Sequence, residues 1–228
     1  MNMTDLEKKL WKKVNRYIPI LRFVPFLRMV AVCNNLAFGK TDEKSDIDLF
    51  IVAKDGRLFI VRFLVTISLH LLGVRRYGKK VAGRFCLSFF IDDSGLNLSD
   101  IAIKQDIYLK MWVRTMKPVL NDGVYGDFIS ANVWANPVVI QVEKVSLGTS
   151  FLLNGRFGDF IERLLKNWQL KRAKIKKTSL RNSDGIIVNE HILKFHNIDR
   201  RKLYRKKWFA KYGKSSPLTL AKFRAIDL

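Results

Sequence analysis

Short apolar runs alternate with longer amphipathic stretches along the first half of the chain. The runs over residues 29–33, 47–52 and 85–91 are rich in β-branched or aromatic residues, which predicts three strands. Residues 57–72 are apolar on most faces and predict a largely buried helix that stops at Gly73. Strand, helix and strand in this order indicate an α/β or α+β fold, in which helices flank a mixed sheet.

Polar and turn-forming residues mark further elements around these strands. Thr4, followed three residues later by Glu7, is a capping-box pattern and predicts a helix over residues 4–16. Gly39 lies in a stretch rich in turn formers, so residues 34–44 should connect two strands as a loop. We expect four more helices, over residues 101–116, 127–135, 159–177 and 199–212, and a further strand over residues 138–142.

Charge is distributed unevenly along the chain. The 228 residues include 42 Lys and Arg against 20 Asp and Glu, a net charge of +22. Residues 161–228 hold 19 basic and 5 acidic side chains, whereas residues 31–160 are nearly balanced. This imbalance indicates a working domain joined to a basic region that attracts polyanions. We therefore divide the chain into an α/β domain over residues 1–120, with its sheet within about residues 20–120, and a basic, mostly helical region over residues 121–228.

The basic region interleaves aromatic with cationic side chains, which can stack bases and follow a phosphate backbone. Residues 161–228 are therefore expected to bind nucleic acid, RNA rather than DNA. Three alternatives stay open: the aromatic side chains anchor helices on the core, the basic helix over residues 159–177 lies on an anionic membrane, or the charge only solvates the surface. The aromatic residues in question are Trp168, Tyr204, Trp208, Phe209 and Tyr212.

Several kinds of site are excluded by the composition. Two cysteines, Cys33 and Cys86, cannot form a disulfide scaffold or a four-cysteine zinc site, and we expect them as small core residues on neighbouring strands. His191 and His196 lie five residues apart, which does not suit a zinc-binding pair on a helix, and no P-loop pattern occurs.

No uncharged apolar run reaches about 18 residues, so no membrane-spanning helix is expected. The first residues lack the pattern of a secretory signal, which favours a cytoplasmic location.

Two carboxylates mark the start of the second predicted strand. Asp46 and Asp48 are two residues apart, so on a strand both side chains point to the same face, while Ile47 points to the core. Carboxylates about 6–7 Å apart along a strand can hold Mg²⁺, or Mn²⁺ in its place, beside a phosphate group. Asp46 and Asp48 are therefore the expected metal ligands and catalytic residues.

The residues around this pair follow an ordered pattern. An apolar strand is followed by a turn containing Leu36, Ala37 and Gly39, and then by Ser-Asp-Ile-Asp-Leu over residues 45–49. This pattern resembles that of the DNA polymerase β-like nucleotidyltransferase superfamily, which has an apolar strand, Gly-Ser, a Leu-Ala-x-Gly turn and Ser-Asp-x-Asp-Leu. The resemblance spans about residues 29–92 and implies a nucleotidyltransferase-like sheet.

The resemblance also implies a nucleotide-binding site next to the two aspartates. The Gly-Ser that holds the triphosphate of a nucleoside triphosphate in the family falls on Asn34 and Asn35, and Ser45 opens the second half of the pattern. Asn35 would offer hydrogen-bond donors to phosphate, and Asn34 tolerates a positive φ better than most residues do. Asn34, Asn35 and Ser45 are accordingly the expected nucleotide-binding residues.

The family uses a third carboxylate on a later strand to activate the attacking hydroxyl. If side chains alternate strictly along the third predicted strand, Asp92 at its end lies on the face that such a carboxylate would occupy. Asp92 is therefore the expected third catalytic residue. The alternative is that Asp92 only forms a turn that ends at Gly95. Alternation would place Phe85, Leu87, Phe89 and Ile91 on the core face, and Cys86, Ser88, Phe90 and Asp92 on the other.

The expected function is Mg²⁺-dependent transfer of a nucleotide from a nucleoside triphosphate to a hydroxyl acceptor, for which the C-terminal charge favours RNA. The alternative is a catalytically degenerate protein of the same fold that acts as a nucleic-acid-binding module. Four basic residues before the third strand are expected to contact phosphate near the same sheet: Arg75, Arg76, Lys79 and Lys80.

Overall fold

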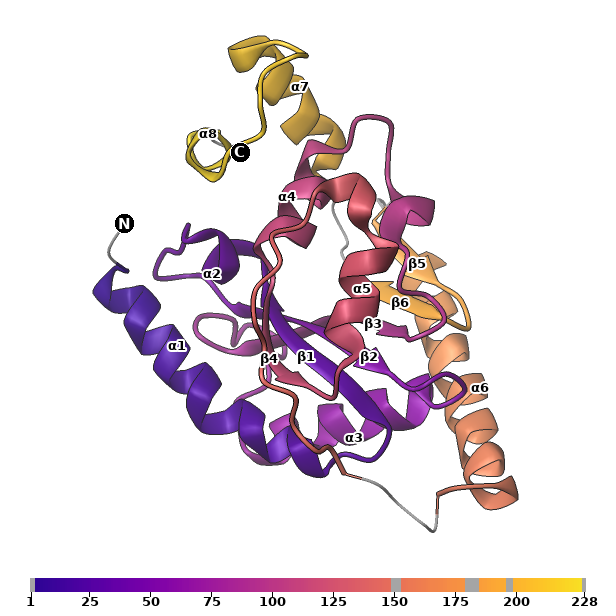
Figure 1. The fold of residues 1–228 in the computed structure, drawn as a ribbon. Coiled ribbons are helices and arrows are strands. Elements are labelled where there is room, and N and C mark those ends of the chain that lie inside the picture. The colour runs from indigo at the N-terminus through magenta and orange to yellow at the C-terminus, as the bar shows by residue number, and fades with distance from the viewer. Residues whose placement is uncertain (1–2, 149–152, 179–184, 196–198, 227–228) are drawn as a thin grey trace.

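A six-stranded mixed sheet forms the centre of the molecule (Figure 1). The computed structural model describes residues 3–148, 153–178, 185–195 and 199–226, and within these ranges the strand order is β4-β1-β2-β3-β6-β5. β2 and β3 are parallel, and the other neighbouring pairs of this sheet are antiparallel. The expected α/β fold with a mixed sheet is confirmed. The strands are β1 (Leu27–Cys33), β2 (Ile47–Ala53), β3 (Phe85–Asp92), β4 (Lys117–Asn121), β5 (Ile186–Val188) and β6 (Ile192–Phe195).

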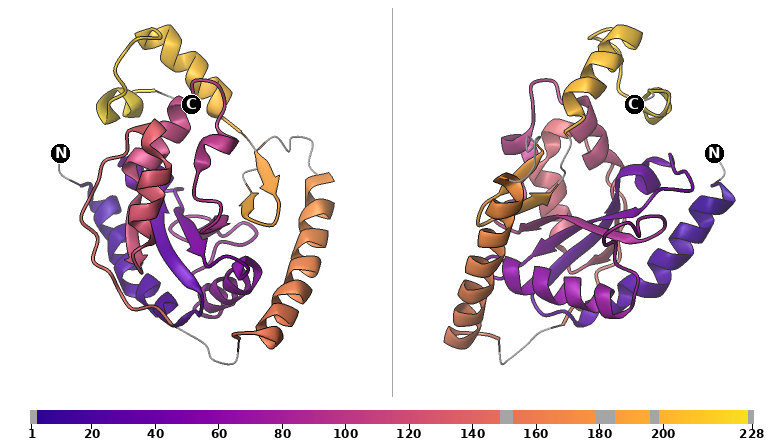
Figure 2. Two further views of the ribbon diagram at one scale, coloured as in Figure 1. Left: turned by 45° about the vertical axis from the view of Figure 1, so that its right-hand side comes forward. Right: turned by 180° about the vertical axis from the view of Figure 1, so that it is seen from behind.

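Helices cover both faces of the sheet and create two hydrophobic cores (Figure 2). Alternation along β2 shows the division, because Leu49 enters one core and Phe50 the other. The first core contains residues of α1 (Asp5–Tyr17), η1 (Ile18–Phe23), α3 (Leu58–Leu71) and α6 (Arg156–Thr178). The second contains residues of α2 (Asn34–Phe38), η2 (Leu98–Ile101), α4 (Ile107–Thr115), α5 (Val124–Ala131), η3 (Val133–Ala135), α7 (Arg201–Tyr212) and α8 (Leu220–Arg224).

The first helices form where local sequence signals place them. At the start of α1 the Thr4 side chain accepts a hydrogen bond from the Glu7 backbone, and the Glu7 carboxylate accepts one from the Thr4 backbone, so the capping box is confirmed. The start of α3 is capped by a residue distant in sequence. The buried Glu162 carboxylate of α6 accepts hydrogen bonds from the backbone N–H groups of Phe59 and Ile60, at 2.9 and 2.8 Å. α6 is thereby fixed to α3.

The connections between elements differ from the sequence-based expectations in four places. The expected loop over residues 34–44 begins with the single-turn helix α2, which ends at Gly39 with a φ of 66°. Residues 138–142 form no strand. Pro118, expected to follow a helix, lies inside β4, and this position is tolerated because β4 is an edge strand whose outer side needs no ladder donor. The helix expected over residues 101–116 is interrupted, and α4 begins after the capping residue Asp106.

The expected domain boundary at residue 120 does not divide the sheet. β5 and β6 come from the basic C-terminal region, yet β6 pairs with β3 and extends the same sheet. α7 is likewise tied to the first part of the chain, since the Arg201 guanidinium lies 3.1 Å from the Asp106 carboxylate at the start of α4. Both pairings join residues about 100 positions apart, which local sequence patterns do not specify.

None of the described helices combines the length and the hydropathy that crossing a membrane requires.

Candidate functional site

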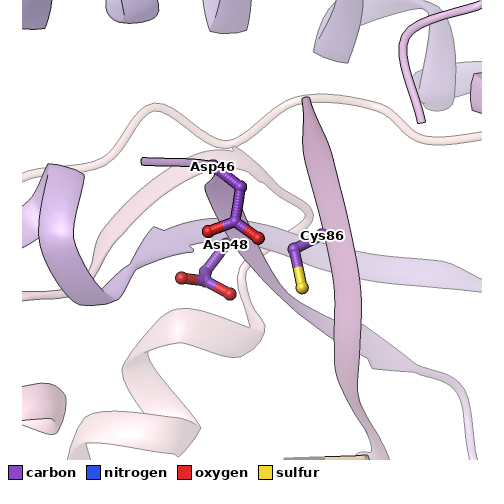
Figure 3. Close-up of side chains that lie close together, drawn as sticks. All are labelled: Asp46, Asp48 and Cys86. Atoms are coloured by element: carbon purple, nitrogen blue, oxygen red, sulfur yellow. The ribbon is translucent and has the colours of Figure 1, made fainter. Parts of the chain in front are cut away.

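Asp46 directly precedes β2 and Asp48 is its second residue, and both side chains lie on the face of the sheet opposite to the core that buries Ile47 and Leu49. The alternation expected from the sequence is therefore confirmed. A third residue, Cys86, joins them (Figure 3). One potential ligand atom from each of the three side chains lies within 4.8 Å of the other two. The two carboxylates are thus close enough to share one divalent cation.

Cys86 belongs to this site because β2 and β3 run in parallel register. Asp48 pairs with Cys86 on one side and with Cys33 of β1 on the other. The cysteines are buried, as expected, but they do not lie on neighbouring strands, since β2 separates them. Burial, followed by the charge of Asp48, raises the pKa of the Cys86 thiol, so the thiol is protonated at neutral pH. Cys86 therefore adds a neutral group beside the carboxylates.

The two carboxylates repel each other in a partly buried setting. Burial and then the charge of Asp46 raise the pKa of Asp48 to about 7, although a hydrogen bond from Asn34 lowers it in part. A divalent cation between the carboxylates would remove this repulsion. The donor set of two carboxylate groups therefore fits Mg²⁺ or Mn²⁺, which prefer oxygen ligands.

Arg76 neutralises part of the charge at this site. Its guanidinium Nη1 lies 2.6 Å from Asp46 Oδ2 and 3.8 Å from Cys86 Sγ. Arg76 is one of four basic residues expected near the sheet, and it is the one that these contacts bring to the carboxylates. Lys80 instead lies over the ring of Tyr77, with its Nζ 5.5 Å from the ring centroid.

Asn34 and Asn35 begin α2 directly after β1. Asn34 has a φ of 56°, the left-handed conformation that the sequence suggested it could adopt. Its side chain is buried, accepts a hydrogen bond from the Tyr108 hydroxyl at 3.0 Å and also bonds Asp48, so it orients that carboxylate. Asn35 is exposed and lines a cavity next to Asp48. The structure therefore brings both asparagines to the aspartate pair.

Ser45 has a different place from the one expected. Its hydroxyl donates a hydrogen bond to Asp42 Oδ1 and accepts one from the Asp42 backbone, both at 2.9 Å. The side chain is buried in this turn and is not part of the cavity lining. Ser45 therefore shapes the connection that leads into β2, and a role in nucleotide binding is not supported for it.

Asp92 does not join the aspartate pair, so its assignment as the third catalytic carboxylate is wrong. Asp48 pairs with Cys86 near the start of β3, whereas Asp92 pairs with Ala53, five residues further along β2 and roughly 17 Å away at 3.3 Å per residue. A register shift between these pairs inserts one extra residue into β3. The inserted residue reverses the alternation, so that Phe89 and Ile91 enter the second core while Phe90 enters the first.

Asp92 forms a turn instead, as the alternative interpretation held. Its Oδ1 accepts hydrogen bonds from the backbone N–H groups of Ser94 and Gly95, both at 3.2 Å, and from the Ser94 hydroxyl at 2.6 Å. Its Oδ2 lies 2.8 Å from His191 Nδ1, and Asp55 lies close by, 3.9 Å from the same nitrogen. These contacts fix the turn after β3 to the β5–β6 hairpin.

A cavity of about 660 Å³ opens beside Asp48. This volume suits a small-molecule ligand such as a nucleotide. Aromatic side chains from α2, β3, α4 and α7 form much of its wall, and charged side chains of both signs also line it. Its lining includes Asn34, Asn35, Phe38, Asp48, Phe89, Tyr108, Trp112, Lys194, Arg200, Arg201 and Tyr204.

Most of this lining could not be assigned from local sequence patterns. Tyr108 and Trp112 are four residues apart on α4, a spacing that is typical of any buried helix face. Lys194 lies in a strand of four residues, too short to stand out by alternation. Arg200 and Arg201 fall in the basic helix expected over residues 199–212, and the position of this helix against the sheet depends on long-range contacts.

The aromatic residues of the basic region divide into two groups. Tyr204 and Trp208 are buried in the second core, and Phe209 and Tyr212 pack against it, so these four anchor α7. Trp168 on α6 is 48% exposed, with the Arg172 guanidinium 5.1 Å from its ring centroid. The anchoring interpretation is thus right for α7, and Trp168 is the one of the five whose ring is open to a partner.

Comparison with protein-family models and with curated proteins finds no match to this chain.

Proposed function

We propose that the protein transfers a nucleotide from a nucleoside triphosphate to a hydroxyl acceptor with the help of Mg²⁺ or Mn²⁺. The acceptor oxygen would bond to the α-phosphorus as pyrophosphate leaves, and the hydroxyl proton would pass to solvent. The observation that carries this proposal is the pairing of Asp46 and Asp48 on one face of β2, with ligand atoms within 4.8 Å, beside a nucleotide-sized cavity. The order of strand, turn and Ser-Asp-x-Asp around the pair supports it.

The two aspartates would hold the cation, and Asn34 keeps Asp48 oriented toward it. The ion, when bound, supplies positive charge that neutralises phosphate oxygens during an in-line displacement. Asn35 is exposed at the cavity and can donate hydrogen bonds to phosphate. The aromatic wall of the cavity, which includes Tyr108 and Trp112, can enclose a nucleobase and exclude water from it.

We infer from the charge of the C-terminal region that the acceptor is RNA. On α7, Lys202 and Lys206 are exposed, and on α6 Lys171, Arg172 and Lys174 are exposed. A polyanion would be attracted to these side chains, and Trp168 could stack on an unpaired base.

A non-catalytic binding module is the second candidate. Two observations favour it: Arg76 already pairs with Asp46 at 2.6 Å, and the described residues place no third carboxylate with Asp46 and Asp48. Such a module would bind RNA with an affinity that falls steeply with salt but does not depend on the aspartates.

The two candidates are separated by an assay with labelled nucleoside triphosphates, mixed RNA and Mg²⁺ or Mn²⁺. Under the proposed function, Asp46→Asn and Asp48→Asn each reduce transfer at least about 100-fold, equivalent to about 2.7 kcal/mol. Asp127→Asn, on the exposed side of α5, is the matched control and keeps full activity. Transfer that survives the double replacement of Asp46 and Asp48 contradicts the proposed function, and RNA binding without any transfer supports the binding module.

A further inference from the structure

Lys194 is a buried cation that forms no ion pair with a described residue. Its side chain lies on β6, and the residue is 8% exposed. Its Nζ donates one hydrogen bond, to the Gly185 carbonyl at 3.3 Å, and none of the ion pairs between described residues includes it. Burying an ammonium group is costly unless an anion accompanies it. A bound anion would therefore offset the cost of burying this ammonium group.

The sheet directs Lys194 into the same cavity as Asp48. Lys194 pairs with Phe89 on β3, Phe89 pairs with Phe50 on β2, and Asp48 lies two residues before Phe50. Directly paired residues project to the same face of a sheet, and both Asp48 and Lys194 line the cavity. Two strand spacings and two residues separate their Cα atoms by about 12 Å. The carboxylate and the ammonium thus line two separate parts of one cavity.

Asp199 and Asp106 balance the charges of Lys194 and Arg201, so the exposed Arg200 gives this part of the cavity one net positive charge. Arg201 repels Lys194, but Arg201 is itself paired with Asp199 at 2.7 Å and with Asp106 at 3.1 Å. Arg200 is exposed and lines the same cavity, and its guanidinium has no partner among the described residues. Burial, then Arg201, lowers the pKa of Lys194 to about 8, against smaller opposing effects of Asp199 and Asp106. Lys194 and Arg200 are therefore two cations open to an anion.

We propose that Lys194 and Arg200 form a subsite for a phosphate monoester group of the acceptor, in a part of the cavity separate from Asp48. The identity of the ligand as an acceptor rests on the proposed function, whereas the presence of an anion subsite does not. The acceptor would place its hydroxyl near the aspartate pair and its phosphate on Lys194 and Arg200. The phosphate could belong to the end of an RNA or to a small phosphorylated alcohol, since the two cations recognise the same group in both.

Calorimetric titration in the presence of EDTA tests the subsite, because the chelator removes cations from the aspartate pair. The probes are one trinucleotide with a 5′-phosphate or a 5′-hydroxyl, and glycerol 3-phosphate against glycerol. We expect the phosphorylated form of at least one pair to bind about tenfold more tightly than its unphosphorylated form. The pair that shows this preference identifies the source of the phosphate, and wild-type protein that shows it for neither pair overturns the proposal.

Four variants make the test specific. Lys194→Met and Arg200→Gln should each remove most of the preference for the phosphorylated ligand, whereas Lys202→Met, an exposed lysine of α7 outside the cavity, should keep it. The double variant Asp46→Asn, Asp48→Asn should keep it too. Arg200→Gln guards against a folding defect at the buried lysine, because Arg200 is exposed. A preference that persists in both Lys194→Met and Arg200→Gln overturns the proposal.

Proton uptake gives a readout that a purely structural lysine would not change. An anion beside Lys194 raises the pKa of its ammonium group from about 8, so binding at pH 8 should take up protons. Titration in buffers of different ionisation enthalpy measures this uptake, which should be absent in Lys194→Met. A phosphate preference without nucleotidyl transfer would contradict the proposed function alone, and transfer without a phosphate preference would contradict the subsite alone.

Discussion

Asp48 of β2 and Cys86 of β3 stand side by side in a parallel register, and the thiol of Cys86 reaches the carboxylates of Asp46 and Asp48. In this protein the neighbour of the pair is a protonated thiol, because burial raises the pKa of Cys86. A carboxylate at position 86 would add a third charged ligand to the pair, and the effect of this change can be tested.

Replacing Cys86 by Asp should strengthen the cation site. A third carboxylate beside Asp46 and Asp48 increases the attraction for a divalent ion, so we expect the dissociation constant for Mn²⁺ to fall about tenfold. Titration of Mn²⁺ followed by electron paramagnetic resonance measures the change. Cys86→Ser is the control, since it changes the thiol without adding charge and should leave the Mn²⁺ affinity close to that of the wild type. Weaker Mn²⁺ binding by Cys86→Asp than by Cys86→Ser would contradict the assignment of this site.

The stability of the protein should depend on pH through Asp48. Its pKa of about 7 lies above its ordinary value of 3.8, so the native state binds this proton more tightly than the unfolded state does. Protonated Asp48 contributes to the free energy of unfolding at low pH, and this contribution is lost as pH rises from about 4 to about 7. Above pH 7 the group causes no further change. Relative to Asp48→Asn, the wild-type free energy of unfolding should fall by up to about 4 kcal/mol over this range.

Urea denaturation at several pH values measures this dependence. Asp127→Asn should follow the wild-type curve, because Asp127 is exposed on α5. Added Mg²⁺ should restore part of the lost stability at pH 7, since the cation takes the place of the proton. If the free energies of unfolding of the wild type and of Asp48→Asn change in parallel between pH 4 and 7, the pKa of Asp48 is not raised in the native state.

Arg76 should compete with a cation for Asp46. Its guanidinium lies 2.6 Å from the Asp46 carboxylate and is 45% exposed, so the ion pair contributes little to stability. Removing its charge in Arg76→Gln should tighten Mn²⁺ binding about threefold to tenfold, since one positive charge leaves the site. Arg75→Gln, one residue away in the same loop, is the control and should bind Mn²⁺ like the wild type. Unchanged affinity in Arg76→Gln would show that the guanidinium does not compete.

Trp168 should matter for binding and Trp208 for folding. Trp168 is 48% exposed on α6, so Trp168→Ala should weaken RNA binding by about 1 kcal/mol while leaving the melting temperature unchanged. Trp208 is fully buried in the second core, and Trp208→Ala should cost about 3–5 kcal/mol of stability. Gel-shift titrations and thermal unfolding measure the two effects.

Phe160→Ala on the same helix separates RNA from a membrane as the partner of α6. Phe160 is 50% exposed, and its ring should contribute less to RNA binding than the larger indole of Trp168. Equal losses for Phe160→Ala and Trp168→Ala on vesicles of anionic lipid, with no loss for either on RNA, would favour the membrane instead.

Local sequence patterns determined the elements whose signals lie within a few residues. The capping box at Thr4 and Glu7 starts α1, and the β-branched run of β2 places Asp46 and Asp48 on one face. Asn34 could be identified as a residue able to take a positive φ, and it has one. These features follow from the helical and strand periods and from single-residue preferences, which operate without the rest of the chain.

Tertiary structure alone decided which residues meet at the site. The extra residue in β3 moves Asp92 out of phase, the register of β2 and β3 brings in Cys86, and the pairing of β6 with β3 carries Lys194 to the cavity. Short strands and bulges carry too little local signal to be predicted, because their stability comes from neighbours distant in sequence. The sequence alone thus determined the aspartate pair, and long-range strand pairing determined what surrounds it.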